Sequence, residues 1–277
     1  VRALVHSRRR AAVLSAYDVD IAEGDVNIPE SLARACKGVD AVVHLGHRRR
    51  SGPPLDHFFD EKANVEMAYN VFRTAYETGV SRVVMASSNH AADWYETLIH
   101  ERRLEMLDPY KLPLSDNFYG WAKATYEHMG FLFACGGMGF GSSSGGEDHT
   151  GGSQSDQRRM GVVMVRIGAP RDIVLESYKG DAANYKRDLG AYISPRDITQ
   201  LFAKAAEAPN IENEHGVPWL VVYGISNNTR AFWSLTSARK MLGYEPEDDS
   251  EVKYAADIRG FLVGDGAVGG LGRVGLS

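Results

Sequence analysis

The chain has 277 residues, of which 44% are hydrophobic and 24% charged, a balance typical of a folded globular protein. The net charge of −5 argues against a general nucleic-acid binder, and no run of about 18 apolar residues predicts a membrane span. Cys36 and Cys135 form no Cys-x-x-Cys pair, which excludes a disulfide scaffold and a thiolate zinc site. We therefore expect a metal-free protein of a reducing, cytoplasmic setting.

Strand and helix patterns alternate along the first 168 residues. Strands are predicted over 1–6, 19–24, 39–45, 82–87, 160–167 and 217–223. Helices are predicted over 8–16, 30–37, 55–78, 118–134, 195–206 and 236–243. This alternation predicts parallel strands with crossover helices, which is an α/β fold with a Rossmann-like doubly wound sheet. Ligands of such sheets bind at the carboxyl ends of the strands.

Glycine is concentrated in two segments. Of 29 glycines, eight lie in 136–152 and seven in 260–275. The Gly- and Ser-rich run 136–157 predicts a flexible insertion, and 260–277 predicts a Gly-rich tail.

The chemistry-bearing pattern is Tyr119-Gly-Trp-Ala-Lys123. On a helix, residues four apart share a face, so the phenol and the ammonium point into the same site. A free tyrosine has a pKa near 10, and a nearby cation favours the phenolate that a general base requires. By itself the pattern is common and also suits a buried Tyr beside a solvated Lys. Ser88, at the end of a predicted strand, adds a hydroxyl able to hydrogen-bond a substrate oxygen.

Ser88, Tyr119 and Lys123, in this order on strand and helix, resemble the catalytic set of the short-chain dehydrogenase/reductase family. Other runs resemble its extended branch of sugar epimerases, dehydratases and dehydrogenases, and within it the uronate dehydrogenase-like enzymes. These runs are Gly24-Asp25-Val26, His44-Leu45-Gly46, Asn64-Val65, Ser87-Ser88-Asn89-His90, Arg166-Ile167-Gly168 and Tyr223-Gly224-Ile225-Ser226-Asn227. The resemblance covers about residues 1–258.

The resemblance implies a nicotinamide cofactor, NAD or NADP, and a sugar-like substrate. Tyr119 would be the general base, Lys123 would lower the pKa of Tyr119 and hold the nicotinamide ribose, and Ser88 would donate to the substrate oxygen. The residues implied to bind the cofactor are Asp25, Val26, Leu45, Gly46, Asn64, Tyr119 and Lys123. The chain would divide into a cofactor-binding core over 1–170 and a small substrate-binding portion over 171–259. Relatives often pair through helices, so a homodimer is a family expectation.

The substrate-binding residues implied are Asn89, His90 and Arg187. Asn89 and His90 equally suit a structural role after the strand. The family's uronate enzymes use serines as well as an arginine, yet Ala169 stands where one serine is expected, and the other falls within His47-Arg48-Arg49-Arg50. Three arginines at a strand end suggest an anionic sugar such as a phosphate, although a solvated loop explains them too.

Cofactor choice and the sheet centre depart from the family pattern. NAD-dependent relatives usually have an acidic residue after the second strand of the family, where it binds the ribose hydroxyls of NAD. No acidic residue occurs in His6-Ser7-Arg8-Arg9-Arg10, so NADP is an alternative. Val1 begins the strand that corresponds to the second strand of the family, so we expect a gap where the first strand and its glycine turn belong. The tail, with Phe261-Leu262-Val263 followed by Gly266, Gly269 and Gly272, is an alternative occupant of that gap.

We therefore expect an NAD(P)-dependent oxidoreductase acting on a sugar, sugar-acid or sugar-phosphate hydroxyl. Two alternatives remain. One is a nucleotide-sugar epimerase or dehydratase that retains its cofactor, and the other is a non-catalytic Rossmann-fold binding protein.

Overall fold

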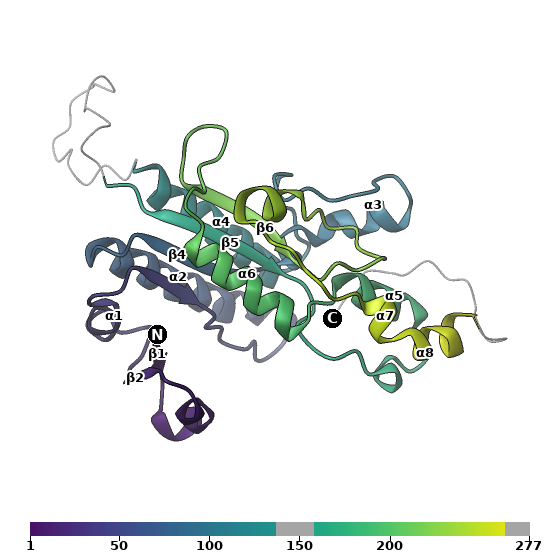
Figure 1. Ribbon diagram of the computed structural model, residues 1–277, viewed down its shortest axis with the longest axis horizontal. Coiled ribbons are helices and arrows are strands. Elements are labelled where there is room, and N and C mark those ends of the chain that lie inside the picture. Colours follow the sequence, from purple (N-terminus) through teal and green to yellow (C-terminus); the bar gives the residue numbers. More distant parts are fainter. Residues whose placement is uncertain (137–157, 264–277) are drawn as a thin grey trace.

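The computed structural model describes residues 1–136 and 158–263, which form parallel strands flanked by helices (Figure 1). The strands are β1 (Arg2–Val5), β2 (Asp20–Glu23), β3 (Ala41–His44), β4 (Arg82–Ser88), β5 (Gly161–Ile167) and β6 (Trp219–Gly224). All six coincide with predicted strands. The predicted insertion and tail fall largely on 137–157 and 264–277, outside the described residues.

The α-helices are α1 (Pro29–Cys36), α2 (His57–Glu77), α3 (Glu96–His100), α4 (Phe118–Cys135), α5 (Ala182–Ala191), α6 (Pro195–Glu207), α7 (Ser250–Lys253) and α8 (Ala255–Ile258). Shorter or irregular helical segments are η1 (Arg8–Ala16), η2 (Pro54–Asp56), η3 (Asn89–Tyr95), η5 (Leu175–Tyr178), η6 (Ala238–Leu242) and η7 (Arg259–Val263). The predicted first helix is η1, a 3₁₀ segment broken at Ala11. No described helix has both the length and the apolar character needed to cross a bilayer.

The strands form two sheets rather than one. β1 pairs in parallel with β2, while β3, β4, β5 and β6 form a separate parallel sheet in that order. Among the described residues no strand joins β1 to β3, so the expected interruption of the sheet is present. The suggestion that 261–263 fill it is wrong, because these residues lie in η7, where Phe261 packs edge-on against Tyr185 of α5.

The four-stranded sheet is covered on both faces (Figure 1). Alternate residues of β5 enter different clusters, because successive strand side chains point to opposite faces. Val162 and Met164 pack with α2 and α4, whereas Val163 and Val165 pack with α6 and η6. A third cluster, built around Tyr185 of α5, joins α5 to α8 beyond the carboxyl ends of the strands.

A buried ion pair joins this sheet to α4. Arg166 of β5 donates to both carboxylate oxygens of Glu127 at 2.8 and 2.7 Å. The side chains are 1% and 3% exposed. Ser87 of β4 also donates to Glu127, and Arg166 donates to the Tyr223 hydroxyl of β6. One network therefore fixes α4 against three adjacent strands.

Replacing Glu127 by Gln is expected to destabilise the chain strongly, because it leaves the buried Arg166 cation without its counter-charge. The free energy of unfolding should fall by about 3–5 kcal/mol in urea titrations. Removing the exposed Arg73–Glu77 pair by Arg73→Ala should lower the free energy of unfolding far less, because water screens this pair. Equal losses in the two variants would contradict this account.

Candidate active site

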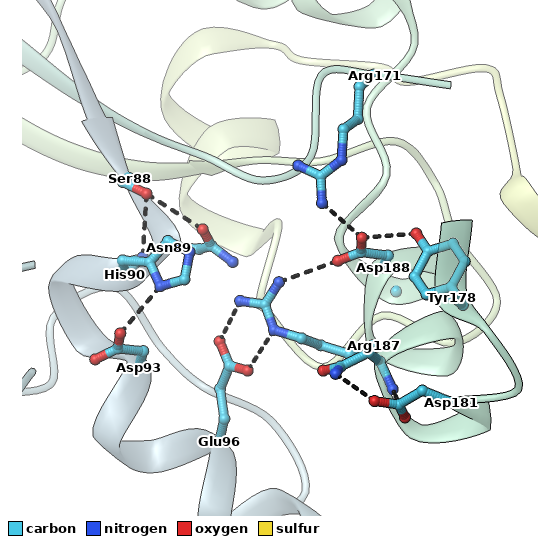
Figure 2. Close-up of polar contacts among 12 residues, drawn as sticks. Ser88, Asn89, His90, Asp93, Glu96, Arg171, Tyr178, Asp181, Arg187 and Asp188 are labelled. Carbon is cyan, nitrogen blue, oxygen red and sulfur yellow. Dashed lines mark hydrogen bonds and ion pairs between the residues drawn. The ribbon is translucent and has the colours of Figure 1, made fainter. Parts of the chain in front are cut away.

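The candidate site lies at the carboxyl ends of β3 and β4. Ser88 ends β4 with its side chain buried. Its hydroxyl accepts a hydrogen bond from the His90 backbone N–H at 3.2 Å and donates to Asn89 Oδ1 at 3.3 Å. Ser88 thus caps η3 and turns the chain at the strand end, as Figure 2 shows. The Asn89 amide is also buried, and its Nδ2 has no hydrogen-bond partner among the described residues.

Tyr119 and Lys123 lie on the first turns of α4. Asn117 begins the helix by accepting a hydrogen bond from the Gly120 N–H at 3.0 Å. The Lys123 ammonium is 5.5 Å from the centroid of the Tyr119 ring and donates to the Ala86 carbonyl at 3.0 Å. The structure therefore brings the expected phenol, ammonium and strand-end hydroxyl to one end of the sheet.

Burial dominates the electrostatics of both side chains. It lowers the pKa of Lys123 to about 8, against the opposing effect of Glu61 and Glu127. Burial raises the pKa of Tyr119, while Ser88 and Arg50 act in the opposite direction. The pKa of Tyr119 therefore lies above its usual value in this structure, in which the Lys123 ammonium donates to a backbone carbonyl, and the lowering of this pKa by Lys123 stays a prediction.

Gly120 allows α4 to approach the turn after β4. A Cβ atom at this position would lie 2.1 Å from the His90 carbonyl oxygen and 2.1 Å from Ser115 Oγ. The helix N-terminus therefore touches backbone that follows Ser88, and this contact sets the relation between Ser88 and Tyr119.

His90 is held by a chain of polar contacts that the sequence did not reveal. Its Nδ1 lies 3.0 Å from Asp93 Oδ2, and the same oxygen accepts from Asn117 Nδ2 at 2.8 Å. The centroid of the His90 ring is 5.7 Å from that of Tyr119. Asp93 thus links the imidazole to Asn117, the cap of α4. In the sequence, the Asn-x-x-Gly pattern that begins at Asn117 was the feature that could have indicated this helix cap.

A cavity of about 830 Å³ opens above these residues, and Tyr119, His90, Arg50, Arg171 and Arg187 are among its lining residues. This volume is ample for a sugar-sized ligand. The cavity lies between the cofactor-binding strand ends and the C-terminal portion that carries α5.

Arg187 lines the cavity as expected, but its guanidinium is already paired (Figure 2). It donates to both oxygens of the buried Glu96 at 2.7 and 2.8 Å, and to Asp188 at 3.3 Å. Asp188 also accepts from Arg171 and Tyr178. The sequence could not show this, because Glu96 lies 91 residues from Arg187 in the chain. Arg187 is therefore held in place by protein carboxylates.

Ala169, at the position of an expected serine, is buried in backbone pairing with Ala191 and Ile193. It contributes no polar group to the cavity. The position thus supports the sequence-based doubt about a uronate substrate.

The residues expected to bind the cofactor occupy strand ends and the adjoining helix. Asp25 follows β2 and accepts hydrogen bonds from the backbone and side chain of Asn27, while Val26 packs into the core. Leu45 and Gly46 follow β3, and the Leu45 side chain is 64% exposed.

Two observations test whether these strand ends suit a dinucleotide. The exposed Leu45 offers an apolar surface for a flat ring, and the buried His44 Nε2 has no hydrogen-bond partner in the described part of the chain. These residues fit a nicotinamide dinucleotide, which Leu45, Gly46, Tyr119 and Lys123 would hold.

Asn64 of α2 holds the loop that follows β3. Its amide accepts from the Arg48 N–H at 2.7 Å and donates to the Arg48 carbonyl at 2.9 Å. It also donates to Glu61 at 3.1 Å. Glu61 is fully buried, and burial raises its pKa. Sequence reasoning missed this carboxylate, although its position three residues before Asn64 places it on the same helix face.

Comparisons with known proteins agree with this fold. A family model described as NAD(P)H-binding matches residues 1–127. An NAD-dependent glucose-6-phosphate dehydrogenase of Haloferax volcanii is 29% identical over 244 residues, which is 85% of this chain and 79% of that protein. A uronate dehydrogenase of Pseudomonas syringae is 26% identical over 230 residues, covering 82% of this chain and 66% of the relative. A glucuronic acid dehydrogenase structure from Chromohalobacter salexigens shares the fold, with a TM-score of 0.62, 24% identity and coverage of 88% and 74%.

Parallel strands with crossover helices and a strand-end site define a dinucleotide-binding α/β protein. Residues 1–127 are similar to NAD(P)H-binding proteins, and most of the chain is similar to an NAD-dependent glucose-6-phosphate dehydrogenase and to a uronate dehydrogenase, which indicates NAD or NADP as the cofactor class.

Gly120→Ala is expected to destabilise the chain by about 1–3 kcal/mol, because the new methyl group meets the His90 backbone. Urea unfolding measures the effect. Gly260→Ala is the control, since a Cβ atom at that position would meet nothing within 4 Å, and it should change stability by less than about 1 kcal/mol. A Gly120→Ala chain as stable as this control would contradict the close packing.

The low pKa of Lys123 predicts a pH-dependent stability. An unfolded lysine has a pKa of about 10.4, and the folded value is about 8. Above pH 8 the unfolded chain therefore binds more protons, so native stability rises with pH. In Lys123→Met, the free energy of unfolding does not rise with pH in this way, because the titrating group is absent. The stability of the variant relative to the unsubstituted chain should fall by about 2–3 kcal/mol from pH 7 to pH 10. A constant difference between the two urea-unfolding curves would refute the assignment.

Proposed function

We propose that the chain is an NAD(P)-dependent oxidoreductase that oxidises a hydroxyl group of a sugar, sugar acid or sugar phosphate. The observation that carries this proposal is the meeting of Ser88, Tyr119 and Lys123 at one end of the sheet, with Tyr119 lining a sugar-sized cavity. Relatives named as glucose-6-phosphate and uronate dehydrogenases support a sugar substrate.

Tyr119 acts as the general base. Its phenolate oxygen accepts the proton of the substrate hydroxyl while the carbon that bears this hydroxyl loses a hydride, which leaves a carbonyl group. A nicotinamide dinucleotide held by Leu45, Gly46, Tyr119 and Lys123 would supply the hydride acceptor. Positioned proton transfer of this kind contributes roughly 10²–10⁴-fold to a rate.

Ser88 and Lys123 support this step from two sides. The Ser88 hydroxyl rotates from Asn89 towards the substrate oxygen and donates to it as the carbonyl forms. Lys123 remains anchored on the Ala86 carbonyl, so its charge stays within reach of the phenolate and of the cofactor ribose. His90, oriented by Asp93, is a further polar group that lines the cavity beside Tyr119.

Incubation of the chain with NAD or NADP and a panel of aldoses, uronates and sugar phosphates tests the function. The proposal predicts release of free NADH or NADPH in amounts equal to the sugar consumed. Sugar conversion without free reduced cofactor would instead indicate an epimerase or dehydratase. Binding without any conversion would indicate a non-catalytic protein.

Tyr119→Phe is expected to lower kcat by about 10²–10⁴-fold, because it removes the proton acceptor. The Kd for the cofactor should change far less, since the ring and Lys123 remain. Fluorescence titration of the reduced cofactor, run beside the kinetic assay, separates the two effects. Full activity of the variant would rule out Tyr119 as the base.

A further inference from the structure

The loop after β3 presents its three arginines differently. Arg48 is tied to α2, since Asn64 binds both of its backbone polar groups and its side chain pairs with Asp60 at 3.1 Å. It lines none of the three cavities described around the site. Arg49 and Arg50 follow directly and do line cavities. The clamp on Arg48 therefore fixes which arginines face the site.

Arg50 lies beside the proposed catalytic base. Its guanidinium carbon is 5.5 Å from the centroid of the Tyr119 ring, and its Nε is 3.8 Å from Glu61 Oε1. It lines the main cavity and two adjoining cavities of about 560 and 430 Å³. The smaller one is lined by His47, Arg49, Arg50 and His57. Basic side chains thus surround the part of the site next to Tyr119.

The charges of the cavity are compensated on one side and in excess on the other. On the α5 side, Arg187 and Arg171 are both bound by carboxylates. On the loop side, Glu61 is the carboxylate paired with Arg50, at the long distance of 3.8 Å. In the described part of the chain, the Arg49 side chain makes no ion pair. Asp116 also lines the two larger cavities here, so Lys123, Arg49 and Arg50 lie against two carboxylates, Glu61 and Asp116, and one positive charge is left in excess on the loop side.

His47 adds a neutral hydrogen-bonding group to this surface. Burial and the nearby cations Lys123 and Arg50 lower the pKa of His47 to about 4. The centroid of its ring is 5.3 Å from that of Tyr119. The positive charge next to Tyr119 is therefore held by arginines, which bind carboxylates and phosphates through paired N–H groups.

We infer that Arg50, supported by Arg49, binds the anionic group of the substrate, in place of the carboxylate-paired Arg187. This inference rests on the proposed function and specifies its substrate as an anionic sugar, either a phosphate ester or a carboxylate. An anionic group on the same monosaccharide as the reacting hydroxyl reaches Arg50, because Arg50 and Tyr119 are direct neighbours.

The test compares glucose, glucose 6-phosphate and glucuronate as ligands of the unsubstituted chain, Arg50→Ala and Arg48→Ala. Arg48→Ala is the matched control, since it removes the same charge from the same loop. Without cofactor, the readout is the rise in Tm that each sugar produces, because a ligand that binds the native state stabilises it. With NAD or NADP, the readout is KM.

We expect at least one anionic sugar to raise Tm more than glucose does, in the unsubstituted chain and in Arg48→Ala. In Arg50→Ala, the same anionic sugar should raise Tm no more than glucose does. The KM of this variant for the anionic sugar should rise about tenfold or more, while its KM for glucose changes little. An effect on glucose 6-phosphate indicates that Arg50 binds a phosphate, and an effect on glucuronate indicates that it binds a carboxylate.

The inference is overturned if anionic sugars raise the Tm of the unsubstituted chain no more than glucose does. It is also overturned if the anionic sugar raises the Tm of Arg50→Ala as much as that of the unsubstituted chain. If no sugar is oxidised, the proposed function fails, and the Tm comparison still decides whether Arg50 binds an anion.

Discussion

The buried contact between Arg166 and Glu127 is the constraint on which the site depends. It fixes α4 against β5, and through Ser87 and Tyr223 it also reaches β4 and β6. Tyr119 and Lys123 lie on α4, so their position over the strand ends follows from this network. A buried pair of charges tolerates little displacement, because a separated partner would be left uncompensated in the core. The orientation of the catalytic helix is thus set electrostatically as well as by packing.

The same principle explains the division of charge around the cavity. On the α5 side, the largely buried Arg187 is neutralised by Glu96 and Asp188, which leaves it little capacity for a ligand. Near Tyr119, the cations Lys123 and Arg50 have Glu61 as a nearby carboxylate. Positive charge therefore lies beside Tyr119, where the proposed phenolate would form and the proposed anionic substrate would bind.

Much of the fold was predictable, because alternating apolar strands and helical periods follow from local sequence. The candidate site was predicted from Ser88 and the Tyr119–Lys123 spacing through their resemblance to a known family, because the spacing alone also suits a structural pair. The pairing of Arg187 with Glu96 was not predictable, since it joins segments 91 residues apart. The helices around η3 and α5 were missed because they are short or weakly periodic. The domain boundary near residue 170 and the homodimer stay predictions.

Transfer of a hydride from sugar to nicotinamide is the central claim. It is tested directly by incubating the chain with NAD or NADP and uniformly deuterated glucose 6-phosphate, glucuronate or glucose, followed by NMR of the cofactor. The account predicts deuterium on the nicotinamide ring of the released reduced cofactor, in an amount equal to the oxidised sugar. Oxidised sugar accompanied by reduced cofactor without deuterium on its nicotinamide ring, or by deuterium released only into water, would contradict it.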